Sequence, residues 1–295
     1  MKNIETKWLE DFLALEEVRN FSQAAELRNI SQSAFSRRIL SLEEALGIKL
    51  FNRTVTPLQL TEEGKLFHSQ TRNILNQLQY NLDELLGHHR KGLPNIKFSA
   101  AHSLSLSVMP QLIKKLSSKY QNFIYSVESI DVDQTVTTLI EGKSDFIFSF
   151  YDELLMQPPF LSMEVLESKL FPATLLNERG MPSFQLDEVN FPLLNYTASS
   201  YMGRLVNRTL NKAHYLEPET IFISSMSELL KNMVLNQQGI AWLPEYTIKN
   251  ELKYKKLCTL GDESLTIPIK AYIYRIDTRL NNTAELFWNA LKENL

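Results

Sequence analysis

Residues 21–53 read FSQAAELRNISQSAFSRRILSLEEALGIKLFNR, and this stretch decides the architecture of the N-terminal region. Ser22 can cap a short helix, and Ser31 can cap a longer one. The longer helix has an apolar stripe at i, i+4, i+7 and i+11, formed by Phe35, Ile39, Leu42 and Leu46. Gly47 then supplies a C-terminal stop. Together with a preceding amphipathic helix, the pattern predicts a helix-turn-helix.

The last helix of this unit has a polar face that is suited to DNA. Gln and Arg side chains can make paired hydrogen bonds to base edges, and Ser can reach a phosphate or a base. Basic side chains outnumber acidic ones within residues 28–53, although the charge over residues 1–90 is balanced. The alternative is a purely structural three-helix unit. We favour DNA binding, with the last helix in the major groove.

Six short motifs follow one another in order through the first 64 residues. They are FSQAA (21–25), SQSAFS (31–36), LE (42–43), LG (46–47), LFNR (50–53) and LTEEG (60–64). Together they resemble the N-terminal signature of LysR-type transcriptional regulators. The resemblance implies a winged helix-turn-helix with a wing across 49–60, and it places Arg53 on backbone phosphate. Ser33 stands where the family usually has proline, which only preorganises the first helical turn. The candidate contacts to a double-stranded DNA operator are Ser22, Gln23, Ser31, Gln32, Ser33, Ser36, Arg37, Arg38 and Arg53.

Residues 62–86 form a long helical pattern without proline. Spacings of four and three define a seam of Phe67, Thr71, Ile74, Leu78, Asn81 and Leu85. Such a seam predicts pairing of two chains, although an amphipathic helix packed on its own domain would show the same pattern. The family resemblance, in which this helix pairs two chains, favours a homodimer through 62–90 and a tetramer built from it.

Composition excludes several classes of protein. The chain has 295 residues, enough for about two domains, with an ordinary 44% of hydrophobic and 22% of charged residues. A net charge of −3 excludes a uniformly basic nucleic-acid coat but not a local basic patch. The single cysteine, Cys258, cannot form an internal disulfide. Neither a signal core nor an apolar run near the ~20 residues of a membrane span is found, so we expect a cytoplasmic protein without membrane contact.

Motifs of catalysis and metal binding are missing from the sequence. It contains no GxSxG, no P-loop, no GxGxxG and no HExxH. His88 and His89 are the only adjacent histidines, and they lack the further Cys or His spacing of a zinc site. We therefore expect no enzyme activity, no cofactor and no metal.

From about residue 94 short β-type runs alternate with helical runs. The expected strands are 95–101, 123–130, 145–150, 191–195, 220–224, 240–243 and 267–275, and the expected helices are 105–120, 132–142, 199–213, 225–238 and 280–295. Alternation of this kind predicts an α/β domain with a largely parallel sheet. The change from a helical pattern to alternating strands and helices places the domain boundary at 87–93.

The C-terminal region also resembles the LysR-type regulators. SSM (224–226) and GIAWLP (239–244) match the second effector subdomain of that family, whose effector domain has two lobes of the periplasmic-binding-protein type. The resemblance implies lobe I at about 94–165 and 268–295, and lobe II at about 166–267. The chain would cross between lobes near 164–169 and return near 266–270.

Ligands in such folds bind at the C-terminal ends of strands and at helix N-termini, where free N–H groups attract polar and anionic groups. Each candidate taken alone is also explained as a helix cap or a surface charge. Their shared topological position is the reason to single them out. The candidate effector or sensing residues are His102, Ser103, Ser105, Tyr151, Tyr201, Met202, Arg204, Ser224, Ser225 and Met226.

A narrower likeness points to an oxidant. The motifs NY (195–196), SYMGR (200–204) and SSMSELLK (224–231) resemble the hypochlorite-responsive branch of the family, which implies sensing by Met202 and Met226. Oxidation of a thioether to sulfoxide makes an apolar side chain polar. The alternative is that both methionines merely fill gaps in the core, and Leu116 replaces one methionine of the branch. Cys258 is a weaker candidate, because residues 254–256 could lower its pKa but no resolving cysteine exists.

The sequence therefore predicts an N-terminal winged helix-turn-helix at 1–61, a dimerising helix at 62–90 and a two-lobed α/β effector domain at 94–295. The expected function is sequence-specific regulation of transcription in response to an oxidant. A regulator that responds to a small organic anion is the first alternative. A cytoplasmic solute-binding protein or an enzyme without a DNA role is the alternative from another class.

Overall fold

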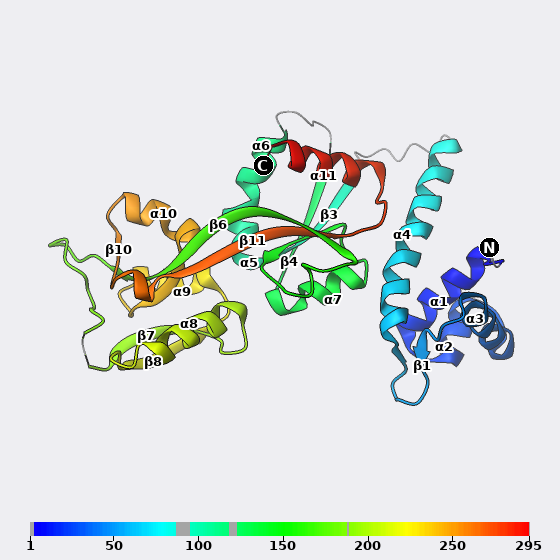
Figure 1. Ribbon diagram of the computed structural model, residues 1–295, viewed down its shortest axis with the longest axis horizontal. Helices are drawn as coiled ribbons and strands as arrows, with labels where there is room; N and C mark the ends of the chain where they lie inside the picture. The colour runs from blue at the N-terminus through cyan, green and yellow to red at the C-terminus, as the bar shows by residue number, and fades with distance from the viewer. Residues whose placement is uncertain (1–2, 87–94, 118–122, 188, 295) are drawn as a thin grey trace.

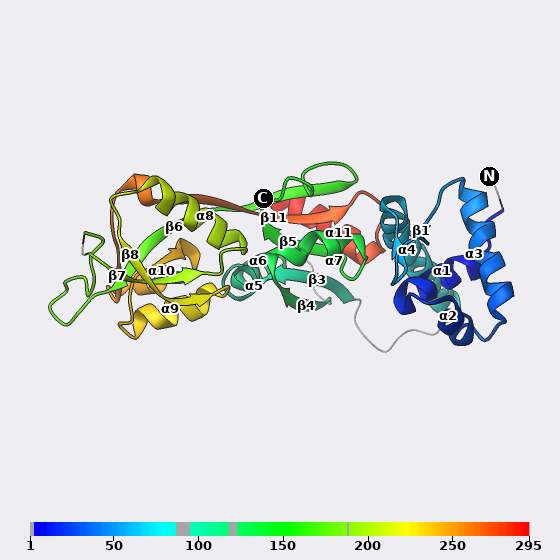
Figure 2. The ribbon, with the colours of Figure 1, turned by 90° about the horizontal axis from the view of Figure 1, so that it is seen from below.

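The computed structural model describes residues 3–86, 95–117, 123–187 and 189–294, which form an elongated molecule (Figures 1 and 2). A helical unit from the N-terminal third occupies one end, and a two-lobed mixed domain occupies the rest. The domain boundary predicted at 87–93, with the His88-His89 pair, lies outside the described residues.

The N-terminal unit has three helices, a small hairpin and a long helix. These are α1 (Thr6–Val18), α2 (Phe21–Leu27), α3 (Gln32–Leu46), β1 (Phe51–Asn52), β2 (Gln59–Leu60) and α4 (Glu62–Leu85). Ser31 caps α3 by accepting the Ala34 N–H at 3.3 Å, and Gly47 ends it with φ 75°, as predicted. The cap predicted at Ser22 is wrong. Asn20 caps α2 by accepting the N–H groups of Ser22 and Gln23, and Ser22 lies within the helix.

The three short helices and the hairpin share one apolar core. Phe12, Phe35 and Ile39 are fully buried in it. Antiparallel pairing of Phe51 with Leu60 forms the predicted wing between α3 and α4. The fold of this unit is therefore a winged helix-turn-helix.

The C-terminal domain places strands and helices in two lobes that share two long strands. Lobe I has β3 (Asn95–Ala101), α5 (His102–Ser107), α6 (Met109–Ser117), β4 (Ile124–Ile130), the 3₁₀ turn η1 (Val132–Gln134), α7 (Thr135–Ile140), β5 (Phe146–Phe150) and α11 (Asn282–Asn294). Lobe II has β7 (Phe191–Tyr196), α8 (Tyr201–Lys212), β8 (Pro218–Ser224), α9 (Ser227–Leu235), β9 (Ala241–Pro244), α10 (Glu245–Lys253), β10 (Leu257–Thr259) and the 3₁₀ turn η2 (Glu263–Leu265). The shared strands are β6 (Phe160–Leu175) and β11 (Ile267–Ile276), which extend through both lobes (Figure 1).

The sheet is mixed, which corrects the expectation of a largely parallel one. Its order is β10-β6-β11-β5-β3-β4, with β9 also paired to β6, and β7 and β8 form a separate parallel pair. The parallel pairs β3–β4 and β3–β5 follow from the predicted alternation. By contrast β11 is antiparallel to both β5 and β6, because the two crossing strands run in opposite directions between the lobes.

The sequence pattern missed β6, β10 and α10. In β6 exposed charged residues such as Glu164, Glu167 and Lys169 alternate with apolar ones, and the sequence pattern predicts only a crossing between lobes here. The helix predicted at 105–120 is two helices, which meet at Val108. Pro110 has no N–H to continue the hydrogen bonding of α5, so the break falls there.

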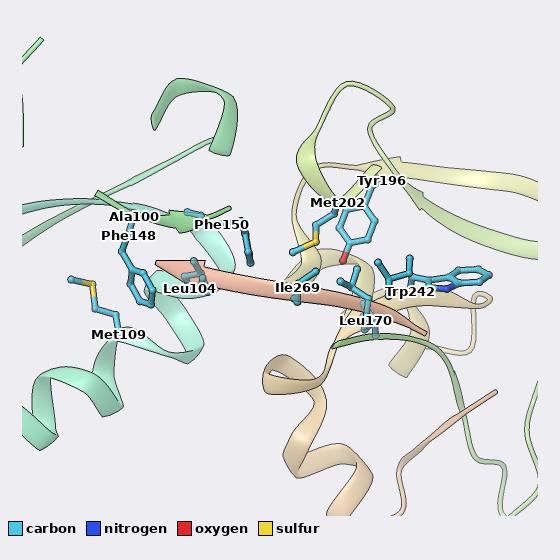
Figure 3. Packing of buried hydrophobic residues seen from close by; sticks show 14 of the residues in the cluster. Ala100, Leu104, Met109, Phe148, Phe150, Leu170, Tyr196, Met202, Trp242 and Ile269 are labelled. Atoms are coloured by element: carbon cyan, nitrogen blue, oxygen red, sulfur yellow. The ribbon is translucent and has the colours of Figure 1, made fainter. Parts of the chain in front are cut away.

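The apolar core of this domain is continuous across the lobes. Figure 3 draws Phe148 and Leu104 of lobe I and Trp242 of lobe II in the same buried cluster, with Ile269 of β11 between them. None of the described helices combines the length and apolar character that a membrane span requires.

Candidate DNA-binding surface and effector cavity

The predicted DNA-binding residues gather on one part of the N-terminal unit. Ser22 and Gln23 lie in the first turn of α2, and the remaining helical candidates lie in the first two turns of α3. The side chains that are exposed are Ser22, Gln23, Ser31, Gln32, Ser33, Arg37 and Arg53, whereas Ser36 and Arg38 are half-buried. Nε of Arg37 donates to the carbonyl of Ser33 at 3.3 Å, one turn earlier on the same helix. This face of α3 offers hydroxyl, amide and guanidinium groups of the kind that read base edges.

A buried carboxylate fixes α3 against the first two helices. Asp11 of α1 is 0% exposed, and its two oxygens accept from Arg28 Nε at 2.8 Å and from Arg38 Nη1 at 3.2 Å. Arg28 also pairs with Glu10. A buried charge is stable only when it is paired and hydrogen-bonded, and here each oxygen has a cationic donor. Arg38 thus has a role in holding the recognition helix, which the sequence analysis did not anticipate.

A second buried carboxylate joins α3 to the wing. Glu43 is 2% exposed, and its Oε1 accepts the N–H groups of Leu50 and Phe51 at 2.9 and 3.3 Å. Its Oε2 accepts from Arg53 at 3.1 Å and from Lys49 at 3.2 Å. The Arg53 guanidinium also lies 5.4 Å from the centre of the Phe21 ring, within cation–π range. Arg53 is therefore positioned by contacts with α2 and α3 before any DNA is bound.

A cavity of about 280 Å³ lies between the two lobes of the C-terminal domain. Lobe I contributes the ends of β3, β4 and β5, and lobe II contributes the segments after β7 and β8. Its lining is rich in hydroxyl and carboxylate groups. The lining residues are Ala101, His102, Ser103, Ile130, Asp131, Val132, Asp133, Gln134, Phe150, Thr197, Ser199, Ser200, Tyr201, Met202, Ser225 and Ser227.

Five of the predicted effector residues line this cavity, namely His102, Ser103, Tyr201, Met202 and Ser225. The other five do not. The hydroxyl of Ser105 donates back to the His102 carbonyl, and that of Ser224 accepts the Met226 N–H at the start of α9. Tyr151 is half exposed beyond β5, and Met226 is 39% exposed outside the lining. Arg204 lies at the rim, where it pairs with Asp133 at 3.1 Å.

η1 also contributes to the cavity lining, which the sequence pattern did not predict. Asp131, Asp133 and Gln134 follow β4 directly, so the same rule that selected the residues after β3 would have found them. Their charges matter, because Asp131 faces His102 at 3.8 Å and Asp133 binds Arg204. The Asp133–Arg204 pair joins lobe I to lobe II across the cavity rim.

Tyr201 and Met202 begin α8 and form the lobe II wall. The Tyr201 ring stacks on Phe150 of lobe I, with 4.9 Å between the ring centres. Burial raises the pKa of Tyr201 to about 12, so its phenol stays neutral at physiological pH. Met202 is 5% exposed, and Figure 3 shows it in the buried cluster with Phe150, Tyr196 and Ile269. Its thioether is thus placed where a polar group is costly.

Cys258 lies on β10, paired with Thr174 of β6. Burial raises the pKa of its thiol, which corrects the expectation that residues 254–256 lower it. A raised pKa reduces the thiolate, which is the reactive form. Among the described residues, no three His, Cys, Asp or Glu side chains gather as a metal site would require.

A winged helix-turn-helix joined to a two-lobed domain with an interlobe cavity defines a class of ligand-responsive DNA-binding regulators. Comparison with known families agrees. Residues 6–65 match the family described as bacterial regulatory helix-turn-helix protein, lysR family, and residues 92–295 match the LysR substrate binding domain. The chain belongs to the LysR family of transcriptional regulators. Its relatives are regulators and not enzymes, which removes the alternative of an enzyme without a DNA role.

Three relatives cover almost the whole chain. The HTH-type transcriptional regulator YjiE of Escherichia coli is 54% identical over 99% of this chain and 96% of its own. The full-length structure of HypT from Salmonella typhimurium, a hypochlorite-specific LysR-type regulator, is 55% identical, with a TM-score of 0.65 over 99% of this chain and 98% of that one. DarR of Vibrio fischeri, solved in complex with DNA, is 41% identical, with a TM-score of 0.63 over 98% of both chains. LysR regulators bind DNA and form oligomers.

Proposed function

We propose that this regulator senses a hypochlorite-like oxidant through a methionine of its effector domain. The observation that carries the proposal is the place of Met202, whose side chain lines the interlobe cavity and yet belongs to the buried core. The 55% identity to a hypochlorite-specific regulator supports the same signal. In this proposal residues 1–61 bind DNA, residues 62–90 pair two chains and residues 94–295 sense the oxidant.

The chemistry balances without a cofactor. The thioether sulfur attacks the chlorine of hypochlorous acid and displaces hydroxide, and water then displaces chloride from the resulting chlorosulfonium. Loss of two protons leaves the sulfoxide, one of them neutralising the displaced hydroxide. In the net reaction sulfur is oxidised by two electrons, hypochlorous acid is reduced to chloride and one proton is released. The product sulfoxide is polar, and at Met202 it would stand in a cluster of apolar side chains. Relief of that cost favours a different packing of α8 against β11 and lobe I, which changes the arrangement of the lobes. Met226 is the second candidate, because its 39% exposure makes its sulfur easier to reach.

The test compares oxidation and DNA binding in matched variants. Brief hypochlorite treatment should add one oxygen at Met202 or Met226, as read by peptide mass spectrometry, and operator affinity should change in step with oxidation at these two positions. Met202→Ile with Met226→Ile keeps similar volume and should abolish the change. Methionine sulfoxide reductase should reverse it. Met181→Ile is the control, since Met181 is 58% exposed and does not line the cavity. A full response in the double variant would reject methionine sensing.

A small organic anion is the less favoured effector. Asp131 and Asp133 line the cavity, and Arg204 at its rim is already neutralised by Asp133. An anion would therefore meet like charge before it met a free cation. The raised pKa of Cys258 likewise gives little support to a thiol sensor.

The assembly proposed here is a homodimer through α4. Phe67 and Leu75 of this helix pack on the core of its own domain, so the alternative packing accounts for Phe67 of the seam. The second half exposes Ile74, Leu78 and Leu85, of which Leu85 is 82% exposed. Pairing of two such stripes would bury them. Leu78→Asp in the 1–90 fragment should shift it from dimer to monomer in sedimentation, whereas Gln79→Ala should not.

Further association would produce the predicted tetramer. The exposed faces of β4 and β8 carry apolar side chains that suit a second interface, with Ile124 and Val127 on one and Ile221 and Ile223 on the other. Val127→Asp in the full chain should stop association at the dimer. A regulator bound to DNA in this way acts in the cytoplasm.

A further inference from the structure

A second groove, of about 490 Å³, lies on lobe II and shares no lining residue with the interlobe cavity. Its walls come from the last two turns of α8, the segment after that helix and the start of β11. Leu205, Arg208 and Lys212 lie on the helix side, and Ile267 and Pro268 lie on the strand side. The site is therefore built from two segments that are far apart in the sequence.

The groove holds two cations without a carboxylate between them. Arg208 and Lys212 are one helical turn apart and both exposed, and within the described part of the chain neither has a hydrogen-bond or ion-pair partner. This differs from Arg204, one turn earlier, which binds Asp133. Glu217, Asp262 and Glu263 lie within two residues of the groove lining along the chain, but none of the three lines the groove. The Asp262 carboxylate accepts the N–H and hydroxyl of Ser264 at 2.8 and 2.5 Å, and no described ion pair joins any of the three to Arg208 or Lys212. The two cations can therefore approach one anionic group together.

The remaining lining combines apolar side chains with the hydroxyl groups of Thr209, Ser264 and Thr266. Leu205, Ile267 and Pro268 line its floor, and Tyr215 adds an aromatic ring that is 69% exposed. We propose that this groove binds a small anionic amphiphile, with its head on Arg208 and Lys212 and its apolar body against Leu205, Ile267 and Tyr215. Head and body each contribute, because charge-assisted hydrogen bonds fix the head and burial of apolar area holds the body.

The position of the groove couples it to the regulator's other site. The first turn of α8 lines the interlobe cavity through Tyr201 and Met202, and the later turns of the same helix line this groove. α8 contacts β11, so the cavity and the groove are both connected to a strand that crosses between the lobes (Figure 2). A ligand held between α8 and β11 stabilises the lobe arrangement in which these two elements form the groove. The inference concerns a different set of residues from the oxidant proposal and does not rest on it.

Titration calorimetry of the full chain tests the proposal with three probes. Octanoate carries both head and body, acetate carries only the head, and 1-octanol carries only the body. We expect octanoate to bind at one site per chain, and acetate and octanol to bind at least tenfold more weakly. Arg208→Ala with Lys212→Ala should weaken octanoate at least tenfold. Lys249→Ala with Lys253→Ala is the matched control, since these lysines have the same spacing on α10 of the same lobe and should leave binding unchanged.

Three results would overturn the proposal. The first is failure of octanoate to bind the wild-type chain at low millimolar concentration. The second is equal binding by the Arg208/Lys212 variant, which would place the ligand elsewhere, including the interlobe cavity. The third is acetate or octanol binding as tightly as octanoate, which would reject the amphiphile. Arg208→Glu provides a second variant on an exposed position, and it should lose octanoate binding while keeping the thermal transition of the wild type.

Discussion

The two ends of the molecule use ion pairs in different ways. In the N-terminal unit Asp11 and Glu43 are buried, and each carboxylate binds two basic side chains. In the effector domain Asp133 and Arg204 meet across the cavity rim with about half of each side chain exposed. Buried carboxylates that lose a partner are costly, whereas exposed pairs contribute little. The winged helix-turn-helix is thus held in one geometry, whereas the two lobes are joined by a contact that can open.

The largest effect is expected from breaking the Glu43 network. Glu43→Ala leaves the buried N–H groups of Leu50 and Phe51 without their acceptor, each at a cost of about 1–3 kcal/mol. Urea unfolding of the 1–90 fragment should show a loss of about 3 kcal/mol. Glu26→Ala, at an exposed position on α2, should change stability by less than about 0.5 kcal/mol. Equal losses would mean that Glu43 does not hold the wing.

Substitutions on the DNA-binding face should separate base contacts from phosphate contacts. Arg37→Ala should weaken binding to the specific operator by about 1–3 kcal/mol, because a bidentate contact to a base edge is lost. Arg53→Ala should weaken all sequences alike and reduce the salt dependence by about one phosphate contact. Gel-shift titrations over a salt series distinguish the two. Wild-type binding by both variants would reject this face.

Acid should weaken the junction between α1 and α4. The imidazole of His68 lies 3.4 Å from Glu16 and lowers the pKa of that carboxyl, so the folded form holds Glu16 ionised more strongly than the unfolded chain does. Because the folded pKa is depressed, the stabilisation is complete above the unfolded pKa of about 4.3 and is lost as the pH falls through the folded value. Glu16→Gln in the 1–90 fragment should reduce the pH dependence of unfolding in that range. An unchanged pH profile would contradict this assignment.

The smallest effect is expected at the interlobe pair. Arg204→Ala should change the stability of the full chain by roughly 0.2–1 kcal/mol, because both partners are half exposed. The loss of the rim contact should also open the lobes, so the radius of gyration in small-angle scattering should increase. Asp133→Asn should give the same result. A stability loss of several kcal/mol would contradict this comparison, because the rim pair would then contribute as much as the buried networks of the winged helix-turn-helix.

Most of the N-terminal unit could be predicted from the sequence, because its signals are local. The cap at Ser31, the stripe through Phe35 and Ile39 and the stop at Gly47 all lie within one helix, and residues three or four apart on a helix share a face. The family motifs added the wing and the two-lobed domain. The same local rules failed where a neighbouring residue was the better cap, as with Asn20 in place of Ser22.

Tertiary structure alone decided the effector cavity and the networks around it. Asp133 and Arg204 are 71 residues apart, and the partners of Asp11 are 17 and 27 residues away, so no spacing in the sequence could pair them. The exposed charges of β6 masked a strand whose place is set by β11 and β9 on its two sides. Only the crossing of β6 and β11 brings the ends of β3, β4, β7 and β8 together, because it is the packing of whole lobes, and not any local pattern, that closes the cavity.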